Sequence, residues 1–562
     1  PIMLNKKQLV ILSSNSTIIQ VMEEMNKFGS QIALLVRADE TLHGIVTEGD
    51  IRRSLIKGND KIDCVVDIMN TLPKTVNENM PFKEVVKLIS DKYKFLPVLD
   101  DEMKIVGLYN FADFSVLIDA KSRTICVLGM GYVGLTLSLV MADVGFKVFG
   151  YDIDKGLIDK LSKGQLSFFE EGIDVYLKKH INNGLMPISN LNSIEADTYI
   201  VTVGTPIDDE TKKPNISYIE QAIISIAPHV KQNDLIILRS TVPVGTTRKV
   251  VLPILREYIN LEPGQDYFLA FAPERTIEGD ALNECRELPQ IVGGYDEKSS
   301  LLTQQLFKEI THTIIEVDSL ESAEMVKIMN NTFRDVKFAY SNEMALICKD
   351  LGLDMVNLVN AANMGYTRDK IPTPSPGVGG PCLTKDSYIL INSTENVASH
   401  PSIVEQSRRV NESIPLVLAE EIVQKLNFLQ KNIEESKVFI IGFAFKGNPE
   451  TSDMRGSTTI DLLNRLRMKK VNNRFIFGYD AVIDPTEIEM LGITHSDLES
   501  GFKNADVVVV MNNHSSHKNI DMFSLLKTAK KDLIFVDGWH MFNPKDITKE
   551  NTINYIGVGC KC

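Results

Sequence analysis

Gly129-Met130-Gly131-Tyr132-Val133-Gly134 follows the short apolar run Thr124-Ile125-Cys126-Val127-Leu128 and precedes an apolar stretch that continues to Val144. Residues 147–152 form the next predicted strand, which ends in Asp152, 23 residues after Gly129. A strand, a Gly-x-Gly-x-x-Gly turn, a helix, a second strand and an acid are, in this order, the pattern of a βαβ unit that binds a dinucleotide. The sequence therefore predicts a doubly wound α/β domain that begins near residue 121.

Each residue of this fingerprint has a physical task in such a unit. Gly129 permits the tight turn, and Gly131 lets a pyrophosphate approach the helix N-terminus, where free N–H groups favour anions. Asp152 would accept the ribose hydroxyls and repel a 2′-phosphate, so the pattern favours NAD over NADP. We expect cofactor contacts at Gly129, Gly131, Tyr132, Val133, Gly134 and Asp152.

Two further apolar runs, 198–203 and 234–238, each end in a polar loop. The loops are Gly204-Thr205-Pro206 and Ser240-Thr241-Val242-Pro243-Val244-Gly245-Thr246-Thr247. Loops at the carboxyl ends of strands line the ligand crevice of a doubly wound sheet. We therefore expect Thr205 and Thr241 to face the cofactor.

The second half of the chain is predicted to contain a helical region followed by a second α/β region. Residues from about 316 to 411 are predicted to be helical, and 322–351 is apolar-periodic without Gly or Pro. Strands are then predicted at 437–441, 474–479, 505–511 and 532–536. The first ends in Gly442-Phe443-Ala444-Phe445-Lys446-Gly447, a glycine turn without the full fingerprint. This indicates a second Rossmann-like domain for a different nucleotide.

Residues 1–120 contain an internal repeat. The segment Leu42-His43-Gly44-Ile45-Val46-Thr47-Glu48-Gly49-Asp50 recurs, with Gly107 and Asp113 lying 63 residues after Gly44 and Asp50. An apolar strand (31–36 and 95–99) precedes each copy, and an amphipathic helix (18–28 and 82–93) precedes each strand. A duplication of this size predicts two similar α+β halves that pack on each other.

Composition narrows the class of protein. The 562 residues are 44% hydrophobic and 24% charged, which suits three to five domains, here divided as 1–120, 121–315, 316–415 and 416–562. A net charge of −14 argues against nucleic-acid and anionic-membrane partners, and no apolar run approaches the roughly 18 residues that span a bilayer. Seven scattered cysteines suit a reducing, cytoplasmic environment.

No metal site is expected. Cys560-Lys561-Cys562 has no second ligand pair at zinc spacing, and we interpret it as a disordered tail. His514 and His517 are interpreted as loop residues without a nearby acidic or cysteine partner.

One cysteine stands out by its neighbours. Cys382 lies in Pro376-Gly377-Val378-Gly379-Gly380-Pro381-Cys382-Leu383-Thr384-Lys385-Asp386, where three glycines and two prolines predict an irregular loop. A cationic neighbour lowers a thiol pKa, and the thiolate is a nucleophile. By itself the pattern is also that of a structural cysteine near a turn. The choice between the two depends on the rest of the chain.

From about residue 122 to its end the chain resembles the UDP-glucose/GDP-mannose dehydrogenase family. The motifs, in family order, are GMGYVG (129–134), STVPVGTT (240–247), PERTIEG (273–279), EMVKIMNN (324–331), GVGGPCLTKD (377–386) and GFAFKGNPETSDMRGS (442–457). The N-terminal repeat resembles a tandem pair of CBS domains. The resemblance implies an α/β protein with two Rossmann-like doubly wound domains joined by a helical linker domain, preceded by an α+β CBS pair.

Enzymes of this family oxidise the C6 alcohol of a nucleotide sugar to a carboxylate and reduce two NAD molecules. The resemblance implies that Cys382 captures the intermediate aldehyde as a thiohemiacetal, which becomes a thioester that water releases. The products of the family feed surface polysaccharides.

The resemblance also implies roles for other residues. Lys327 and Asn331, four apart on one helix face, are similar to the pair that stabilises oxyanion-like intermediates. Asp386 and Thr241 resemble the pair that positions a water. Glu274 resembles the general base of thioester hydrolysis.

Substrate contacts follow in the same way. Lys446 resembles the residue that grips the diphosphate, with Asp453 and Arg455 in its loop, and Glu278 contacts sugar or cofactor in relatives. Arg368 resembles an arginine that reaches the substrate of a neighbouring subunit, which implies a homodimer or a higher homo-oligomer. The implied substrate contacts are Glu278, Lys327, Asn331, Arg368, Gly379, Lys446 and Arg455.

In the CBS pair the resemblance implies an adenine nucleotide near Thr47, Asp50 and Asp113, although Asn110 replaces the second hydroxyl. A docking or dimerisation module without a ligand is an equal alternative. Two positions depart from the dehydrogenase family: Arg239 stands where relatives usually carry an acid, which would alter the charge on the cofactor side, and Trp539-His540 stands where many place arginine.

Simpler interpretations remain for single pairs, because Lys327 and Glu324 could form a surface ion pair and Asp453 and Arg455 a loop salt bridge. Gly-Val-Gly-Gly-Pro-Cys-Leu resembles the branch that acts on UDP-N-acetylhexosamines, so such a UDP-sugar is the expected substrate, without a choice of epimer. UDP-glucose is one alternative. The others are a single-hydride dehydrogenase of a small hydroxy acid and a catalytically silent nucleotide sensor.

Overall fold

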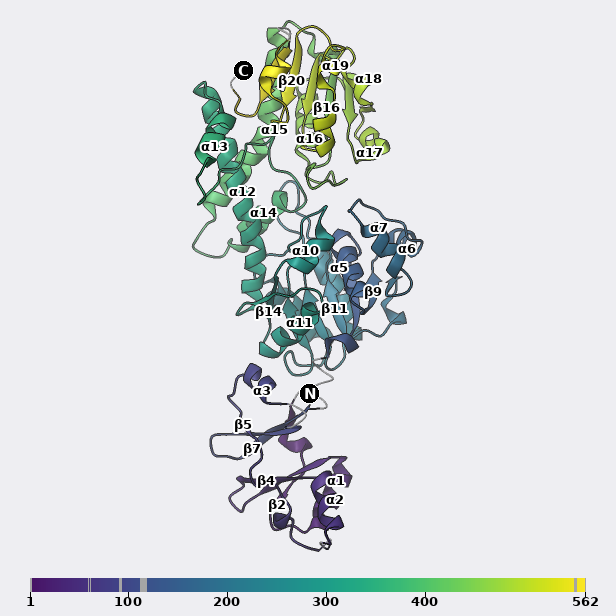
Figure 1. Cartoon of the computed structure of the whole chain (residues 1–562), viewed down its shortest axis with the longest axis vertical. Coiled ribbons are helices and arrows are strands. Elements are labelled where there is room, and N and C mark those ends of the chain that lie inside the picture. Colours follow the sequence, from purple (N-terminus) through teal and green to yellow (C-terminus); the bar gives the residue numbers. More distant parts are fainter. Residues whose placement is uncertain are drawn as a thin grey trace.

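The computed structural model is elongated, with three sheet-containing units in a row (Figure 1). It describes residues 3–58, 60, 62–89, 93–111, 119–549 and 553–560. The N-terminal repeats lie at one end, the fingerprint domain lies in the middle, and the second α/β domain lies at the other end. The long helix α12 (Leu320–Asp350) runs beside the junction of the last two.

The N-terminal unit consists of two similar halves. The first half contains β2 (Ile11–Ser13), α1 (Ile18–Phe28), β3 (Ile32–Val36), β4 (Leu42–Thr47) and α2 (Glu48–Ile56). The second contains β5 (Val76–Asn77), α3 (Phe82–Leu88), β6 (Phe95–Leu99) and β7 (Ile105–Asn110), and β1 (Leu4–Asn5) pairs with β7. One apolar cluster joins the halves and includes Ile32, Leu34, Leu42, Leu99, Ile105 and Leu108. The predicted packing of two halves is confirmed.

The middle domain has an eight-stranded sheet in the order β10-β9-β8-β11-β12-β13-β14-β15. Its strands are β8 (Thr124–Leu128), β9 (Lys147–Tyr151), β10 (Leu185–Ile188), β11 (Thr198–Val201), β12 (Leu235–Leu238), β13 (Phe268–Phe271), β14 (Gln290–Gly294) and β15 (Ile314–Glu316). Only β13 and β14 pair antiparallel. The strand order reverses beside β8, and doubly wound sheets hold ligands at such a point.

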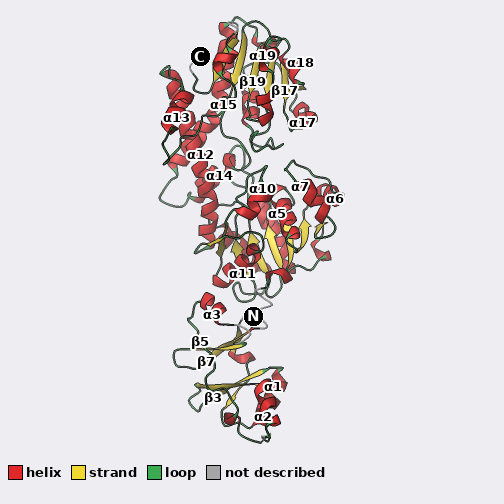
Figure 2. Ribbon diagram, viewed as in Figure 1, coloured by secondary structure: helices red, strands yellow, loops and turns green. Residues whose placement is uncertain are grey.

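Helices flank both Rossmann-like sheets (Figure 2). Those of the middle domain are α5 (Tyr132–Asp143), α6 (Lys155–Ser162), α7 (Ile173–His180), α8 (Ser217–Ile226), α9 (Leu252–Tyr258), α10 (Ala281–Glu287) and α11 (Glu297–Lys308). The central region contains α12, α13 (Met355–Asn363), α14 (Leu383–Ser393) and α15 (Ser402–Phe428). Ser319 begins α12 by accepting the Ser322 N–H at 3.1 Å, and the helix contains no Gly or Pro.

The last domain has a six-stranded sheet in the order β18-β17-β16-β19-β20-β21, and all of its pairs are parallel. Its strands are β16 (Val438–Ile441), β17 (Ile476–Tyr479), β18 (Thr494–His495), β19 (Val507–Val510), β20 (Leu533–Asp537) and β21 (Ile553–Gly557). Its helices are α16 (Thr458–Met468), α17 (Pro485–Met490), α18 (Leu498–Phe502), α19 (Met522–Leu526) and α20 (Pro544–Ile547). The predicted fold class is confirmed.

Two expectations about the last domain are wrong. Cys560 is buried against the core rather than part of a disordered tail, because β21 pairs with β20 and draws the chain inward; Cys562 lies outside the described residues. His514 does have an acidic partner, since its Nε2 lies 2.8 Å from Glu450. Within the described ranges, no helix is long and apolar enough to cross a bilayer.

The second N-terminal half is packed firmly against the middle domain. The Phe82 backbone N–H at the start of α3 donates to Glu297 of α11 at 2.7 Å. One apolar cluster runs through both units and includes Val76, Phe82, Leu96, Val98, Leu302 and Leu306. The two units therefore share a core.

Candidate active site

The fingerprint forms a cradle at the carboxyl end of β8. Gly129 has a φ of 94°, and α5 begins at Tyr132. No side chain caps this end of the helix, so the N–H groups of its first turn are available to a ligand. A Cβ on Gly134 would lie 1.8 Å from the Gly129 carbonyl oxygen, which shows how closely helix and strand pack. The free helix end suits a pyrophosphate.

Asp152 directly follows β9 beside this cradle. Its Oδ2 accepts the Met130 N–H at 2.7 Å and its Oδ1 accepts the Asp154 N–H at 2.9 Å, which fixes the carboxylate at the rim. A cavity of about 420 Å³ is lined by Gly129, Gly131, Asp152, Gly204 and Tyr218 among others. An acid, free helical N–H groups and a cavity together fit the adenosine and pyrophosphate of NAD.

The other residues expected at the cofactor differ in burial and in hydrogen-bond partners. Thr205 is 1% exposed and its hydroxyl has no hydrogen-bond partner within the described chain. Thr241 lies half-buried in the loop after β12. The Tyr132 hydroxyl donates to Glu170 at 2.5 Å, so this ring faces the protein. Val133 is half-buried in the first turn of α5.

Cys382 lies at the N-terminal end of α14 and is exposed. Gly380 before it has a φ of 98°, and a Cβ there would lie 2.7 Å from the Phe445 ring. The Lys327 side chain is buried on α12, with its Nζ 3.5 Å from Glu274. The predicted loop is confirmed, and it ends where a helix begins.

Asn331 and Asp386 meet across the two helices. Asn331 Nδ2 donates to Asp386 Oδ2 at 2.6 Å, and both side chains are buried. The other carboxylate oxygen of Asp386 has no partner within the described residues, so it is available to a water or a substrate group. The predicted set of Lys327, Asn331, Cys382 and Asp386 is thus brought together.

Burial and charge oppose each other at this site. Cys382 is exposed as a residue, yet protein atoms crowd around its thiol, and this desolvation raises the thiol pKa to about 11, against the attraction of the Lys327 ammonium. The expectation of a lowered thiol pKa is therefore wrong for the free protein, because desolvation outweighs the cation. Burial also disfavours the Glu274 carboxylate, but Lys327 and Arg239 prevail and hold its pKa below the ordinary value.

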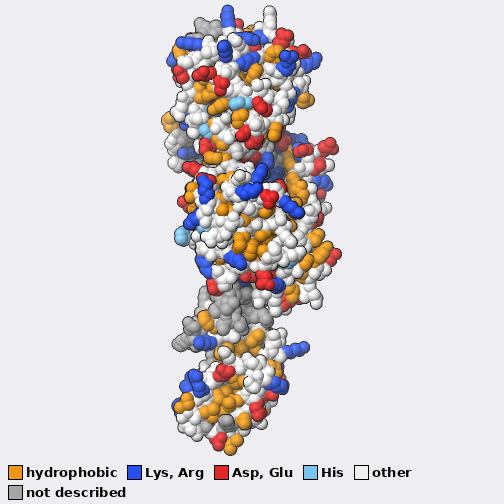
Figure 3. Space-filling view, turned by 90° about the vertical axis from the view of Figure 1, so that its right-hand side faces the viewer, with side chains coloured by type: hydrophobic (Ala, Val, Ile, Leu, Met, Phe, Trp, Pro, Cys, Tyr) orange, Lys and Arg blue, Asp and Glu red, His pale blue; other side chains and the backbone are white. Residues whose placement is uncertain are grey.

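A second polar cluster joins the middle and last domains. Lys446 Nζ donates to the Glu278 carbonyl oxygen at 2.5 Å, and Thr451 Oγ1 donates to the Glu278 carboxylate at 3.2 Å. Arg455 pairs with Asp453 at 2.6 Å and lies 3.8 Å from Glu278. Burial and the Asp453 charge raise the pKa of Glu278 to about 7. Lys and Arg side chains gather at the recess between these domains in Figure 3.

Gly379 lies where the Cys382 loop meets the last domain. A Cβ on this glycine would lie 2.5 Å from the Gly456 carbonyl oxygen. The Gly380 N–H donates to the same oxygen at 3.1 Å. The loop of the last domain that carries Gly456 therefore contacts the Cys382 loop.

Among the described residues, several that are predicted to bind ligands make no contact with the Cys382 site. Arg368 is exposed on the loop after α13, over the Tyr366 ring, and within the described chain it has no ion pair or hydrogen bond to the Cys382 site. Thr47 and Asp50 cap α2 for each other, with hydrogen bonds of 2.7 to 3.3 Å. Asp113 lies outside the described residues.

The two departures have structural explanations. Arg239 is buried and donates to the Ala272 carbonyl and to Gln290 at 3.0 and 2.9 Å, and its charge helps to lower the pKa of Glu274. Trp539 Nε1 donates to the Met511 carbonyl at 2.8 Å. Trp539 is therefore anchored to its own domain.

Three supporting carboxylates escaped the sequence interpretation. Glu170 accepts the N–H groups of Gly279 and Ala281 at 2.6 and 2.7 Å, which holds the loop that carries Glu278. Glu324 binds the 240–247 loop by accepting the Thr247 N–H at 2.9 Å, so the suggested surface pair with Lys327 is wrong. Asp335 binds Arg408 under the Cys382 loop. Each partner is 73 or more residues away, and no local pattern marks such pairs.

A dinucleotide cradle, a thiol beside a buried lysine and a second nucleotide-type domain define an NAD-dependent nucleotide-sugar dehydrogenase, which is an oxidoreductase. The chain belongs to the UDP-glucose/GDP-mannose dehydrogenase family. The NAD binding domain of that family matches residues 123–311, the central domain 321–413 and the UDP binding domain 439–544. CBS domains match residues 4–57 and 65–118.

Similar proteins carry related names. The chain is 32% identical to a UDP-N-acetyl-D-mannosamine dehydrogenase of Pyrococcus horikoshii over 77% of this chain and 99% of that protein. It is 29% identical to an NDP-N-acetyl-D-galactosaminuronic acid dehydrogenase of Ralstonia nicotianae over 72% of this chain and 94% of that protein. A solved UDP-D-ManNAc dehydrogenase of Pyrococcus horikoshii superimposes with a TM-score of 0.70 at 31% identity, covering 78% of this chain and 99% of that one.

Proposed function

We propose that this enzyme oxidises the C6 alcohol of a UDP-N-acetylhexosamine to the carboxylate through a covalent adduct on Cys382. The net reaction consumes the alcohol, two NAD⁺ and one water, and yields the carboxylate, two NADH and three protons. The product suits the synthesis of surface polysaccharides. The observation that carries the proposal is the exposed thiol beside the buried Lys327–Glu274 pair and the Asn331–Asp386 pair.

NAD⁺, when bound at Gly129, Gly131, Gly134 and Asp152 beside Tyr132, Val133, Thr205 and Thr241, supplies the hydride acceptor of both oxidations. Asp386 and Thr241 position a water that takes the alcohol proton, and Lys327 stabilises the oxygen anion that forms at C6. Asn331 supports this by fixing Asp386 at 2.6 Å. The protein thus holds the alcohol oxygen between a cation and a proton acceptor.

The Cys382 thiol loses its proton to water, and the thiolate adds to the aldehyde carbon, which forms a C–S bond and moves the C=O electrons to an oxygen that Lys327 faces. Loss of the second hydride leaves a thioester. Glu274 takes a proton from the attacking water, the C–S bond breaks, and the thiol is restored. The low pKa of Glu274 keeps it ionised for this step.

The substrate contacts are proposed at the junction of the last two domains. Lys446 and Arg455 meet the diphosphate charge, while Glu278, Lys327, Asn331 and Gly379 lie around the sugar. The named relatives act on N-acetylhexosamine derivatives, which supports this substrate class over UDP-glucose. A screen of UDP-sugars for NADH production tests it, and exclusive turnover of UDP-glucose would sink it.

We also propose that a second copy of the chain packs on α12. Four of its large apolar residues are 43–64% exposed and recur at intervals of four or seven along one face: Met329, Phe333, Tyr340 and Ile347. Leu351, the residue that directly follows the helix, is 69% exposed and continues the row. This face suits the expected homodimer or higher homo-oligomer. Arg368 can then serve a neighbouring subunit, since it has no ion pair or hydrogen bond at its own site in the described chain.

An adenine nucleotide at the CBS pair stays a prediction. The mutual capping of Thr47 and Asp50 supports the alternative of a docking module, because both side chains already have partners. Calorimetry with AMP and ATP tests the point. No heat at millimolar nucleotide would leave docking as the module's function.

A further inference from the structure

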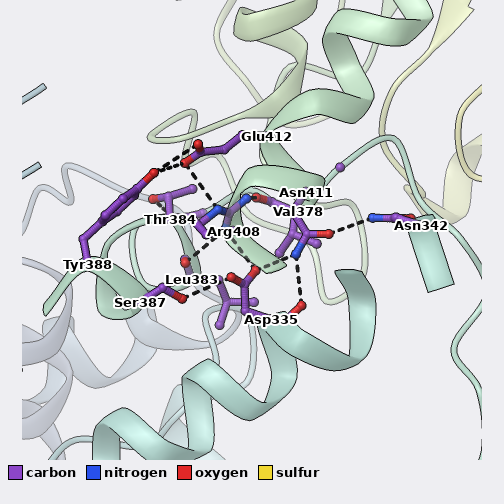
Figure 4. Close-up of polar contacts among 12 residues, drawn as sticks. Asp335, Asn342, Val378, Leu383, Thr384, Ser387, Tyr388, Arg408, Asn411 and Glu412 are labelled. Carbon is purple, nitrogen blue, oxygen red and sulfur yellow. Dashed lines mark hydrogen bonds and ion pairs between the residues drawn. The ribbon is translucent and has the colours of Figure 1, made fainter. Parts of the chain in front are cut away.

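A buried polar cluster beneath the Cys382 loop has no part in the chemistry proposed above. Arg408 of α15 and Asp335 of α12 form an ion pair at 3.0 Å, and each side chain is 1% exposed. Figure 4 shows the two side chains meeting between the helices and the loop. Two charges so far from water need many partners, and the identity of those partners is informative.

Arg408 holds the loop on both sides of the thiol. Its Nη2 donates to the Val378 carbonyl oxygen at 2.9 Å, and its Nη1 donates to the Leu383 carbonyl oxygen at 3.1 Å (Figure 4). Val378 precedes Cys382 by four residues, and Leu383 follows it directly. The guanidinium is a rigid fork, so it fixes the distance between these two carbonyls.

Asp335 extends the same cluster to the helix that carries Asp386. Its Oδ1 accepts from Asn411 Nδ2 at 2.8 Å, and its Oδ2 accepts from Ser387 Oγ at 3.1 Å. Asp335 lies one turn after Asn331 on α12, and Ser387 follows Asp386 on α14. Asn331 and Asp335 therefore hold α14 at two successive residues.

We propose that Arg408, braced by Asp335, is a positioning residue that sets the place of Cys382 relative to Lys327. This inference rests on the proposed function of Cys382 as the nucleophile. Alcohol oxidation uses Lys327, Asn331 and Asp386 and does not need the thiol. Displacement of the Cys382 loop should therefore impair aldehyde capture more than the first oxidation.

The test variant is full-length Arg408→Lys, which keeps a cation beside Asp335 but loses the fork. With the UDP-N-acetylhexosamine that the wild type oxidises fastest, NADH per sugar should fall from two toward one. A hydrazine should then trap free aldehyde. In single turnover, the second NADH should form about 10- to 100-fold more slowly, with the first changed less than about threefold.

A substrate-free readout accompanies this assay. The rate at which iodoacetamide alkylates Cys382, followed on its peptide by mass spectrometry, should change at least about threefold in Arg408→Lys, since the thiol leaves its position beside Lys327. Arg409→Lys is the matched control: Arg409 is the next residue, is 65% exposed and pairs only with Glu405, at 2.7 Å, among the described residues. It should behave as wild type in both assays.

Two outcomes overturn the inference. One is an Arg408→Lys enzyme that keeps two NADH per sugar and the wild-type alkylation rate, and the other is an equal loss of both oxidation steps. If Arg408→Lys does not fold, Asp335→Asn takes its place in the same assays, and failure of both to fold assigns the cluster to stability alone and overturns the inference. Failure of the proposed function is separate: Cys382→Ser would then still give two NADH per sugar.

Discussion

At the scale of single residues, desolvation decides the protonation state of the Cys382 thiol in the free protein. Cys382 lies beside Lys327, yet its pKa is raised to about 11 because the surrounding protein replaces water that would solvate the thiolate. Burial also disfavours the Lys327 ammonium, but Glu274 leads the neighbouring negative groups that raise its pKa. In the free protein Lys327 is therefore protonated, whereas Cys382 is mostly a neutral thiol and becomes a thiolate only when it reacts.

The alkylation of Cys382 should accordingly depend on pH over an unusually wide range. Since about one thiol in a thousand is ionised at pH 8 when the pKa is about 11, the rate should rise about tenfold per pH unit up to pH 10 or beyond. Peptide mass spectrometry after iodoacetamide treatment follows it. A plateau at or below pH 9 would contradict the effect of burial.

Replacement of Lys327 by an uncharged residue of similar size should strongly reduce the turnover rate. Lys327→Met removes the cation that faces the developing oxygen anion, and kcat should fall about 10²- to 10³-fold. Alkylation of Cys382 should also slow, because the loss of the cation raises the thiol pKa further. Steady-state NADH assays check the first effect, and a kcat within threefold of wild type would refute the assignment.

At the scale of elements, the cofactor cradle depends on how α5 packs against β8. Gly134→Ala would place a Cβ 1.8 Å from the Gly129 carbonyl oxygen and 2.6 Å from Thr202 Oγ1. The helix must shift, which should cost about 1–3 kcal/mol of stability and weaken NAD binding. Thermal melts and calorimetry with NAD measure both.

Gly49→Ala is the matched control for that helix variant. Gly49 lies on α2, where an added Cβ would make only ordinary van der Waals contacts, with Arg53 Nη1 at 3.4 Å and Thr47 Oγ1 at 3.6 Å as the nearest atoms. Neither stability nor NAD binding should fall. Wild-type NAD affinity in Gly134→Ala would show that α5 does not form the cradle.

The apolar face of α12 predicts the oligomeric state. Phe333 is 64% exposed on that face, and Phe333→Glu should shift the protein toward the monomer in sedimentation or light-scattering measurements. Met490→Glu, on an 83% exposed residue of α17, should leave the mass unchanged. A wild type that is monomeric at micromolar concentration would remove the proposal.

The sequence predicts elements far better than the contacts between them. The helix at 18–28 and the strand at 124–128 match the structure, and the strand at 147–152 is one residue too long, because apolar periodicity and glycine turns are local signals. The supports of the site were missed: Glu170 lies 109 residues from Gly279, and Arg408 lies 73 from Asp335. Only the fold brings these pairs together.

The errors have the same origin. His514 finds Glu450 across 64 residues, and Cys560 is buried because β21 pairs with β20. The expected lowering of the thiol pKa rests on a cation close in sequence, Lys385, which follows Cys382 by three residues; desolvation by the folded protein, which no local pattern reveals, is the larger effect. Motif matching correctly groups Lys327, Asn331 and Asp386 with Cys382, which the fold brings together, because the spacing of these motifs along the chain is itself distinctive.

At the scale of the molecule, the residues of the proposed site come from three regions. The middle domain supplies Glu274, the central helices supply Lys327 and Cys382, and the last domain supplies Lys446. The second N-terminal half shares a core with the middle domain, so changes in the repeats have a physical route to the dehydrogenase.

The number of NADH formed per UDP-sugar tests the central claim most directly. With limiting UDP-N-acetylhexosamine and excess NAD⁺, the wild type should form two NADH per sugar, and Cys382→Ser should form at most one. One NADH per sugar in the wild type, or two in Cys382→Ser, would contradict a thiol that holds the aldehyde between two oxidations.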